Sequence, residues 1–255
     1  MHENLASTKN VCADGFRFSA LCGVLERTLA EGLLGSYHLK GGAALELRFA
    51  GQARATKDLD VGMDGPRAGR LETLRAALLS GFDDFTFRAK GGARDMQLAD
   101  TIRVEVAVLY QSRPWQTIEV DLGPGAKTAV DLVHPRVEGL EELGLPVTSP
   151  VRCLSLSEQV AQKIHACTSP HSAGRARDIV DVLLIEAAAT LDLAATAAAV
   201  NRVFVERGTH RFPNSFQVPA ESRPELETMA ADLELKETHW TEIEARFETF
   251  LQRLA

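Results

Sequence analysis

Residues 37–64, YHLKGGAALELRFAGQARATKDLDVGMD, decide the fold. They predict a short strand, a turn at Gly41-Gly42, a short helix, a polar loop and a second strand that carries Asp58-Leu59-Asp60. Glycine lets the backbone turn sharply and approach a ligand closely, and the start of the following helix offers free N–H groups to an anion. The stretch therefore predicts a seat for phosphate groups at Gly41 and Gly42.

The Asp58-Leu59-Asp60 element predicts a metal site on the second strand. Side chains alternate along a strand, so both carboxylates point to one face and Leu59 to the other. Mg²⁺ prefers a few carboxylates together with substrate phosphates. A Gly-Gly pair alone is most often a turn, and an Asp pair alone is most often solvated. Their order and their separation of 15 residues favour metal-assisted nucleotide chemistry.

Length and composition are those of a globular protein. The 255 residues suffice for one large domain or two small ones, with 45% hydrophobic and 25% charged residues. The four cysteines have no C-x-x-C spacing, which argues against a zinc site or a disulfide framework. The sequence holds no run of 18 apolar residues, so we expect a cytoplasmic protein without a membrane partner. The net charge of −7 argues against a generic nucleic-acid binder but does not exclude RNA.

A third carboxylate for the metal site is expected on a neighbouring strand. The segment DTIRVEVAVLY (100–110) alternates strictly, with valine and isoleucine on one face and Arg103 and Glu105 on the other. Glu105 is the candidate, although an outward charge on an edge strand is the plain alternative. Asp121, in TIEVDLG, is the runner-up for the same role.

The chain changes character at a segment with Gly144, Pro146 and Pro150, which predicts a boundary near residue 145. Beyond it, Ser155 and Glu158 form a capping box for a helix over 156–167, in which Lys163 lies beside an apolar stripe. We therefore expect an α/β protein. Residues 1–145 would form a mixed β-sheet core with flanking helices, one of which is predicted over 14–34, and residues 146–255 would form a mainly helical region that closes the nucleotide cleft.

Four segments carry a resemblance to a known family. HLKGGAALELRF and RATKDLDVGM, then LSEQVAQKIHACTS and GRARDIVDVLLI, resemble in order the motifs of the AbiEii nucleotidyltransferase toxins, which include the MenT-type toxins. That family belongs to the polymerase-β-like nucleotidyltransferase superfamily, and the resemblance covers about residues 14–185. The chain departs from the pattern at Arg177, where the family has Lys, and lacks the Arg expected shortly after Thr168.

The resemblance implies a nucleotidyltransferase core fold, NTP as substrate and two Mg²⁺ ions. It implies the metal ligands Asp58, Asp60 and Glu105, the catalytic residues Asp58, Asp60, Lys163 and Asp178, and the nucleotide-binding residues Lys40, Gly41, Gly42, Arg175 and Arg177. It further implies a toxin with a cognate antitoxin, which transfers a nucleoside monophosphate to an RNA acceptor, most simply the 3′ end of a tRNA.

Two other functions fit the same motifs. One is a nucleotidyltransferase that modifies a protein or a small molecule, and the other is a non-enzymatic NTP-binding module. If the acceptor is RNA, we expect a small local set of cations to hold it: Lys40, Arg48, Arg54, Lys163, Arg175 and Arg177.

Overall fold

A computed structural model describes residues 21–26, 31–32, 35–49, 52–82, 84–96, 100–125, 128–135, 150–170, 172 and 174–255. Its contacts divide the chain into a first unit, Met1–Gly51 with Ala55–Leu154, and a second unit, Gln52–Arg54 with Ser155–Ala255. The helix expected over 14–34 is present at 21–26, but residues 31 and 32 form a turn, so the helix does not extend to residue 34. The other positions of this segment lie outside the described residues. The expected boundary at residue 145 also lies outside them.

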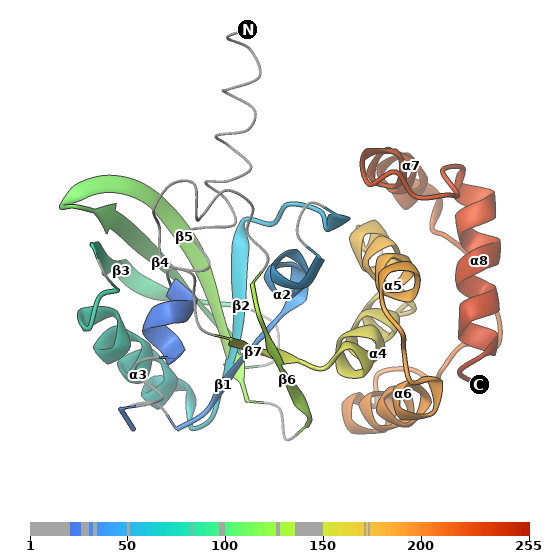
Figure 1. The fold of residues 1–255 in the computed structure, drawn as a ribbon. Helices are drawn as coiled ribbons and strands as arrows, with labels where there is room; N and C mark the ends of the chain where they lie inside the picture. The colour runs from blue at the N-terminus through green and yellow to red at the C-terminus, as the bar shows by residue number, and fades with distance from the viewer. Residues whose placement is uncertain are drawn as a thin grey trace, which may run out of the picture. The chain divides into compact units, whose positions relative to one another are not determined.

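The first unit is built on a sheet whose described strands number seven, in the order β3-β4-β5-β2-β1-β7-β6 (Figure 1). In chain order they are β1 (Tyr37–Lys40), β2 (Asp58–Met63), β3 (Phe85–Asp95), β4 (Ile102–Tyr110), β5 (Arg113–Pro124), β6 (Val130–Val133) and β7 (Val151–Leu154). Helix α2 (Gly41–Phe49) follows β1 directly, and α3 (Arg67–Leu79) lies between β2 and β3 in the chain.

Strand pairing makes the sheet mixed. β2 runs antiparallel to β1 and parallel to β5, and β1 runs parallel to β7. β4 is antiparallel to both β3 and β5, and β6 is antiparallel to β7. The expected α/β class with a mixed sheet and flanking helices is confirmed.

One face of the sheet is the hydrophobic core of this unit. The alternation expected in β4 is confirmed, because Ile102, Val104, Val106 and Val108 are all buried. They share the core with Leu59 and Val61 of β2, with Val120 and Leu122 of β5, with the 21–26 helix and with Leu74 and Leu78 of α3. Since the strand period is two, the residues between them, which include both members of the Asp pair, lie on the opposite face.

The second unit is helical: α4 (Leu156–Cys167), α5 (Ala176–Ala188), α6 (Leu193–Arg207), α7 (Arg223–Asp232) and α8 (Trp240–Gln252). α4 packs against α5 and α6, and α7 packs against α5 and α8. The Ser155 side chain accepts a hydrogen bond from the Glu158 N–H, as the capping box predicts. The apolar stripe of α4, Val160, Ala161 and Ile164, is fully buried.

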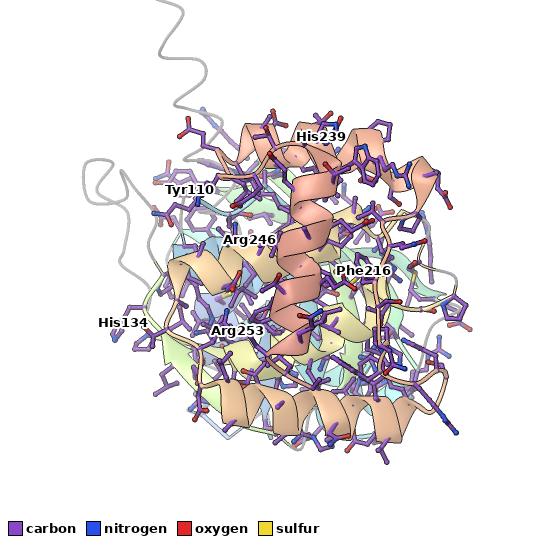
Figure 2. The ribbon with its side chains drawn as sticks, turned by 90° about the vertical axis from the view of Figure 1, so that its right-hand side faces the viewer. Tyr110, His134, Phe216, His239, Arg246 and Arg253 are labelled. Atoms are coloured by element: carbon purple, nitrogen blue, oxygen red, sulfur yellow. The ribbon has the colours of Figure 1, made fainter. Side chains whose placement is uncertain are left out.

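Ion pairs hold α8 against α5. Arg246 and Arg253 project from α8 (Figure 2), and both donate hydrogen bonds to the Glu186 carboxylate on α5, at 3.2 and 2.7 Å. Beneath them Ile243, Phe247 and Phe250 are fully buried. One side of α8 therefore fills the core of this unit, while its arginines fix its position along α5.

The described cysteines Cys22, Cys153 and Cys167 are free and buried. Among the described helices, none combines the length and the apolar character that crossing a bilayer requires.

Stability should fall in mild acid because of His38 on β1. Its imidazole, 4% exposed, lies over Gly62 of β2, where a Cβ would collide with the ring. Burial, and then the positive charge of Lys40, lower the pKa of His38 from 6.5 to about 4. The unfolded chain therefore binds a proton between these values that the folded chain does not, and the free energy of unfolding should decrease as pH falls from 6.5 towards 4.

Urea unfolding at a series of pH values measures this decrease, which is limited to about 1.4 kcal/mol per pH unit for one group. His38→Gln should reduce the pH dependence and leave the part due to His165, whose pKa is also lowered from 6.5 to about 4, whereas His134→Gln, at an exposed position, should leave it unchanged. A wild-type slope retained in His38→Gln would contradict the assignment.

Candidate active site

The two halves of the opening motif touch in the folded chain. Gly41 has φ +65°, a conformation that favours glycine, and it begins α2 directly after β1. A Cβ at this position would collide with Oδ2 of Asp60, so the carboxylate lies against the Gly41 backbone. The phosphate seat expected at the start of α2 and the Asp pair expected on β2 therefore form one locus.

A second aspartate stands beside Asp60 because β2 and β5 are parallel neighbours. Asp60 is in register with Asp121 of β5, and Asp58 with Glu119. Residues in register on adjacent strands project to the same face. Glu105, the expected third carboxylate, lies on β4 opposite Glu119, one strand further from β2. The register therefore brings Asp121, rather than Glu105, next to the Asp pair.

Arg103 of β4 sits in the middle of these carboxylates. Its Nε and Nη2 donate hydrogen bonds to both oxygens of Asp121 at 2.7 and 2.8 Å, and its Nη1 donates to Glu119 at 2.8 Å. Nη2 also reaches Asp58 Oδ2 at 3.2 Å. The hydrogen bonds to Asp121 raise the pKa of Arg103 despite the opposing effect of burial, and the charges of Asp121, Asp58 and Glu119 add to the rise.

Glu105 is engaged on the outer side of the site. It accepts a hydrogen bond at 3.0 Å from Arg94, whose side chain is 74% exposed. It also borders two hollows. The smaller, of about 200 Å³, is lined by Lys90, Gly91, Gly92, Arg94, Arg103 and Glu105, and the larger, of about 630 Å³, by Ala55, Thr56, Lys57, Glu105, Gln116, Thr117 and Glu119.

Lys40 lies on the other side of the carboxylates. It is in register with Asp60 across β1 and β2, and its Nζ is 3.0 Å from where a Cβ on Gly123 would be. Gly123 is two residues beyond Asp121 on β5, so the ammonium reaches across the sheet on the face of the Asp pair. Lys40, Gly41 and Asp60 are therefore neighbours around the start of α2.

The donor chemistry of this face fits a hard divalent cation. Asp58, Asp60 and Asp121 supply carboxylate oxygens from two adjacent strands, and Mg²⁺ uses such oxygens together with phosphates. Within the described residues, no three or more His, Cys, Asp or Glu side chains converge on a metal position as they stand. Asp58 and Asp121, together with Glu119, instead accept hydrogen bonds from the guanidinium of Arg103, a positive charge of the protein itself.

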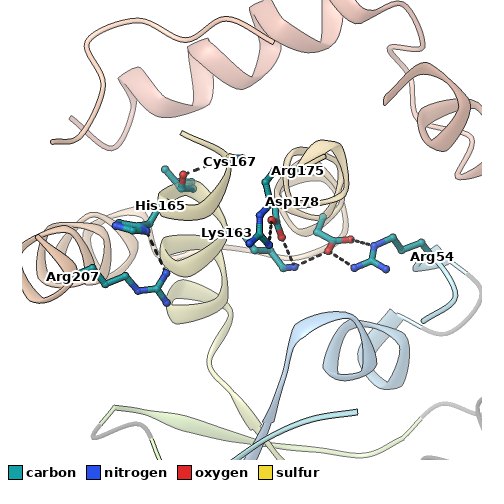
Figure 3. A network of polar contacts seen from close by, with 9 residues as sticks. Arg54, Lys163, His165, Cys167, Arg175, Asp178 and Arg207 are labelled. Carbon is teal, nitrogen blue, oxygen red and sulfur yellow. Dashed lines mark hydrogen bonds and ion pairs between the residues drawn. The ribbon is translucent and has the colours of Figure 1, made fainter. Parts of the chain in front are cut away.

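The second unit holds a separate buried ion-pair network (Figure 3). Lys163 of α4, 7% exposed, donates to Asp181 at 2.6 Å and to Asp178 at 3.4 Å on α5. Arg54 makes two hydrogen bonds of 3.1 Å to the same Asp181, and Arg175 lies 3.5 Å from Asp178. Burial opposes the charge on Lys163, but the carboxylates of Asp181 and Asp178 outweigh it, so the pKa of Lys163 is raised.

The cations expected around a nucleotide or an acceptor therefore differ in accessibility. Arg177 is exposed on α5, and Arg175 is partly exposed. Arg48 is bonded to Asp131 at 2.9 Å and to the Leu154 carbonyl at 3.0 Å, with its side chain only 11% exposed. Arg54 is held by Asp181. Arg48 and Arg54 thus serve internal contacts in the structure.

Arg103 and Asp181 were not identified from the sequence. Arg103 belongs to the polar face of the alternating 100–110 segment. The alternation predicts the face to which its side chain points, but it does not predict the carboxylates that it contacts. Asp181 lies three residues after Asp178 on α5, a spacing that puts both carboxylates on one side of a helix. Strand alternation and helix spacing predict which face of an element carries a charged side chain, but they do not identify its ion-pair partner.

The sequence model of the family described as nucleotidyl transferase AbiEii toxin, type IV TA system, matches residues 24–253. No curated protein sequence matches the chain.

Among solved structures, the chain resembles MenT4, a nucleotidyltransferase toxin from Mycobacterium tuberculosis H37Rv. The TM-score is 0.58 and the identity 16%, over 97% of this chain and 89% of that one. At this identity the likeness concerns the fold. The antibiotic-resistance factor ANT(2'')-Ia is also matched, with a TM-score of 0.45 and 14% identity over 76% of this chain and 95% of that one.

Loss of Lys163 should destabilise the second unit. Lys163→Ala removes one of the partners of Asp181, which keeps Arg54, and leaves the buried Asp178 with a contact of 3.5 Å to Arg175. Removing one member of a buried ion pair costs roughly 3–5 kcal/mol. Urea unfolding should show a loss of this order for Lys163→Ala and a change within about 0.5 kcal/mol for Arg177→Ala, which removes an exposed cation from α5. Equal stability of both variants would mean that the network contributes little.

Proposed function

The chain belongs to the AbiEii family of nucleotidyl transferase toxins, and on this premise we propose that it transfers a nucleoside monophosphate from an NTP to an RNA acceptor. The observation that supports this most is the grouping of Gly41, Asp60 and Asp121: a glycine turn at the start of a helix, with two carboxylates from adjacent strands beside it. Helix starts bind phosphate groups, and paired carboxylates bind the cation that accompanies them.

The reaction is a displacement at the α-phosphorus of the NTP. The acceptor hydroxyl oxygen forms a bond to that phosphorus, the bond to the bridging oxygen breaks, pyrophosphate leaves and the hydroxyl loses its proton. Asp58, Asp60 and Asp121 would hold Mg²⁺, of which two ions are expected. When bound, such ions supply charge stabilisation for the entering and leaving oxygens. Glu105 stays the alternative to Asp121.

The chain's own groups orient the triphosphate. Lys40, Gly41 and Gly42 surround the start of α2, where an ammonium and backbone N–H groups can neutralise phosphate oxygens. In the second unit, Arg175 and Arg177 are the cations with exposed surface that we assign to the nucleotide.

Lys163 and Asp178 are assigned to catalysis as a pair. Because the Lys163 ammonium is buried between Asp178 and Asp181, it acts by holding the Asp178 carboxylate in position. We assign Asp178, which is 7% exposed like Lys163, to contact with the nucleotide or its metal.

The acceptor is an RNA end, and the 3′ end of a tRNA is the specific proposal. The lining of the larger hollow includes Lys57, directly before Asp58, and Thr117 of β5, to which Lys90 donates a hydrogen bond of 2.7 Å. Lys57 and Lys90 are exposed, so their positive charges can meet a backbone phosphate near the carboxylates. The protein would act in the cytoplasm as a toxin that a cognate antitoxin restrains.

Substitution of single carboxylates should distinguish the residues that bind the metal from those that do not. Asp60→Ala and Asp121→Asn should each lower pyrophosphate release from NTP by roughly a thousandfold or more, because each removes part of the transition-state charge stabilisation. Glu105→Gln, one strand further out, should retain most of the rate. A severe loss in Glu105→Gln with a mild one in Asp121→Asn would make Glu105 the third ligand, and near-normal turnover in Asp60→Ala would contradict the site itself.

The acceptor is tested by incubating the protein with labelled NTP, Mg²⁺ and total RNA, and by following which species gains label. In the double variant Lys57→Gln/Lys90→Gln, labelling of RNA should fall by about tenfold and depend less on salt, since two phosphate contacts are lost. NTP binding should stay unchanged. Arg75→Gln removes an exposed charge from α3, away from the hollow, and is the matched control. Label on a protein or a small molecule with RNA unlabelled would favour the other transferase class.

A further inference from the structure

Arg103 makes contacts that are unusual beside a proposed metal site. Its guanidinium donates four hydrogen bonds to three carboxylates, those of Asp58, Glu119 and Asp121. Two of these carboxylates, Asp58 and Asp121, belong to the proposed metal ligands. A cation of the protein itself therefore occupies the centre of the charge that should attract a metal ion.

We propose that Arg103 is an internal counter-ion that competes with the metal: it neutralises the carboxylates in the free protein and has to leave them when the metal–nucleotide complex binds. This inference rests on the metal site of the proposed function. It assigns Arg103 a positioning role, because the guanidinium acts through Asp58 and Asp121.

The clustered carboxylates on β2 and β5 need a positively charged partner, because they repel one another. Asp58, Asp60, Glu119 and Asp121 lie in register on two adjacent strands, and like charges so close repel one another. A bidentate guanidinium–carboxylate pair is among the stronger ion pairs in proteins, and Arg103 makes one with Asp121. The free protein is thereby relieved of repulsion without a metal, while any entering ion has to displace an already bound charge.

A hollow beside Arg103 can accept its guanidinium when the guanidinium leaves the carboxylates. The hollow of about 200 Å³ is lined by Arg103 itself and by Glu105, which stands two residues along β4 on the same face. The Arg103 side chain can turn towards this hollow and pair with Glu105. The present arrangement, in which the described acidic side chains form no ready metal cluster, is then the closed state of the site.

The decisive experiment is Mn²⁺ binding without nucleotide, followed by the EPR signal of free Mn²⁺. Arg103→Gln removes the competing charge and should bind Mn²⁺ at least about tenfold more tightly than the wild type. Arg94→Gln, which removes an arginine that pairs with Glu105 on the neighbouring strand, should bind like the wild type. Adding Asp60→Asn to Arg103→Gln should abolish the gain, which locates the ion at this site.

The result that overturns the inference is an Arg103→Gln chain that binds Mn²⁺ no more tightly than wild type or Arg94→Gln. A parallel titration with a non-hydrolysable NTP analogue separates this failure from that of the proposed function. If the wild type binds Mn²⁺ with the analogue but Arg103→Gln gains nothing without it, only the counter-ion inference is wrong. If no Mn²⁺ binds even with the analogue, the metal site itself is wrong.

The unmodified chain offers a second measurement if Arg103→Gln fails to fold. The Arg103 Nε–H, which donates to Asp121 at 2.7 Å, gives an NMR resonance that Arg103→Lys identifies by its loss. Adding Mg²⁺ with the NTP analogue should shift this resonance, because the hydrogen bond to Asp121 breaks. A resonance that stays unchanged while the analogue binds would show that Arg103 keeps its place and would overturn the inference.

Discussion

The parallel pairing of β2 with β5 is the constraint on which the candidate site depends. It sets Asp60 beside Asp121 and Asp58 beside Glu119, and so gathers four carboxylates on one face of the sheet. The opposite face is closed by the valine, leucine and isoleucine side chains of the same strands. Because a shift of one residue would turn every side chain to the other face, burial of the apolar face also fixes the direction of the acidic one.

Such a concentration of negative charge needs cations, and the chain supplies them from the flanking strands. Arg103 of β4 bonds to Asp121, Glu119 and Asp58, while Lys40 of β1 is in register with Asp60. The second unit follows the same principle with Lys163 between Asp178 and Asp181. In both units, residues proposed for the nucleotide site are paired with opposite charges within the protein. In the proposed mechanism these internal ion pairs have to open when substrate binds.

Much of this architecture could be predicted from the sequence, because it depends on residues that are close together in the chain. The Gly41-Gly42 turn, the Asp58-x-Asp60 strand, the alternation of β4 and the Ser155 cap each depend on residues within a few positions of one another. Which strand neighbours β2 depends instead on chain segments about sixty residues apart, so Glu105 and Asp121 could not be separated. The ion-pair partners of Arg48, Arg54 and Lys163 also come from distant segments. The sequence does not show whether such a cationic side chain faces solvent or a buried carboxylate.

In the proposed function, the carboxylate face at Asp60 and Asp121 is the metal site of a nucleotidyltransferase. A crystal structure with Mn²⁺ and a non-hydrolysable NTP analogue, examined by anomalous scattering, tests it most directly. We expect an anomalous peak bonded to Asp60 and Asp121, the triphosphate at the start of α2, and Arg103 withdrawn from the carboxylates. A nucleotide bound elsewhere, with Arg103 still joined to Asp121 and no Mn²⁺ beside Asp60, would contradict it.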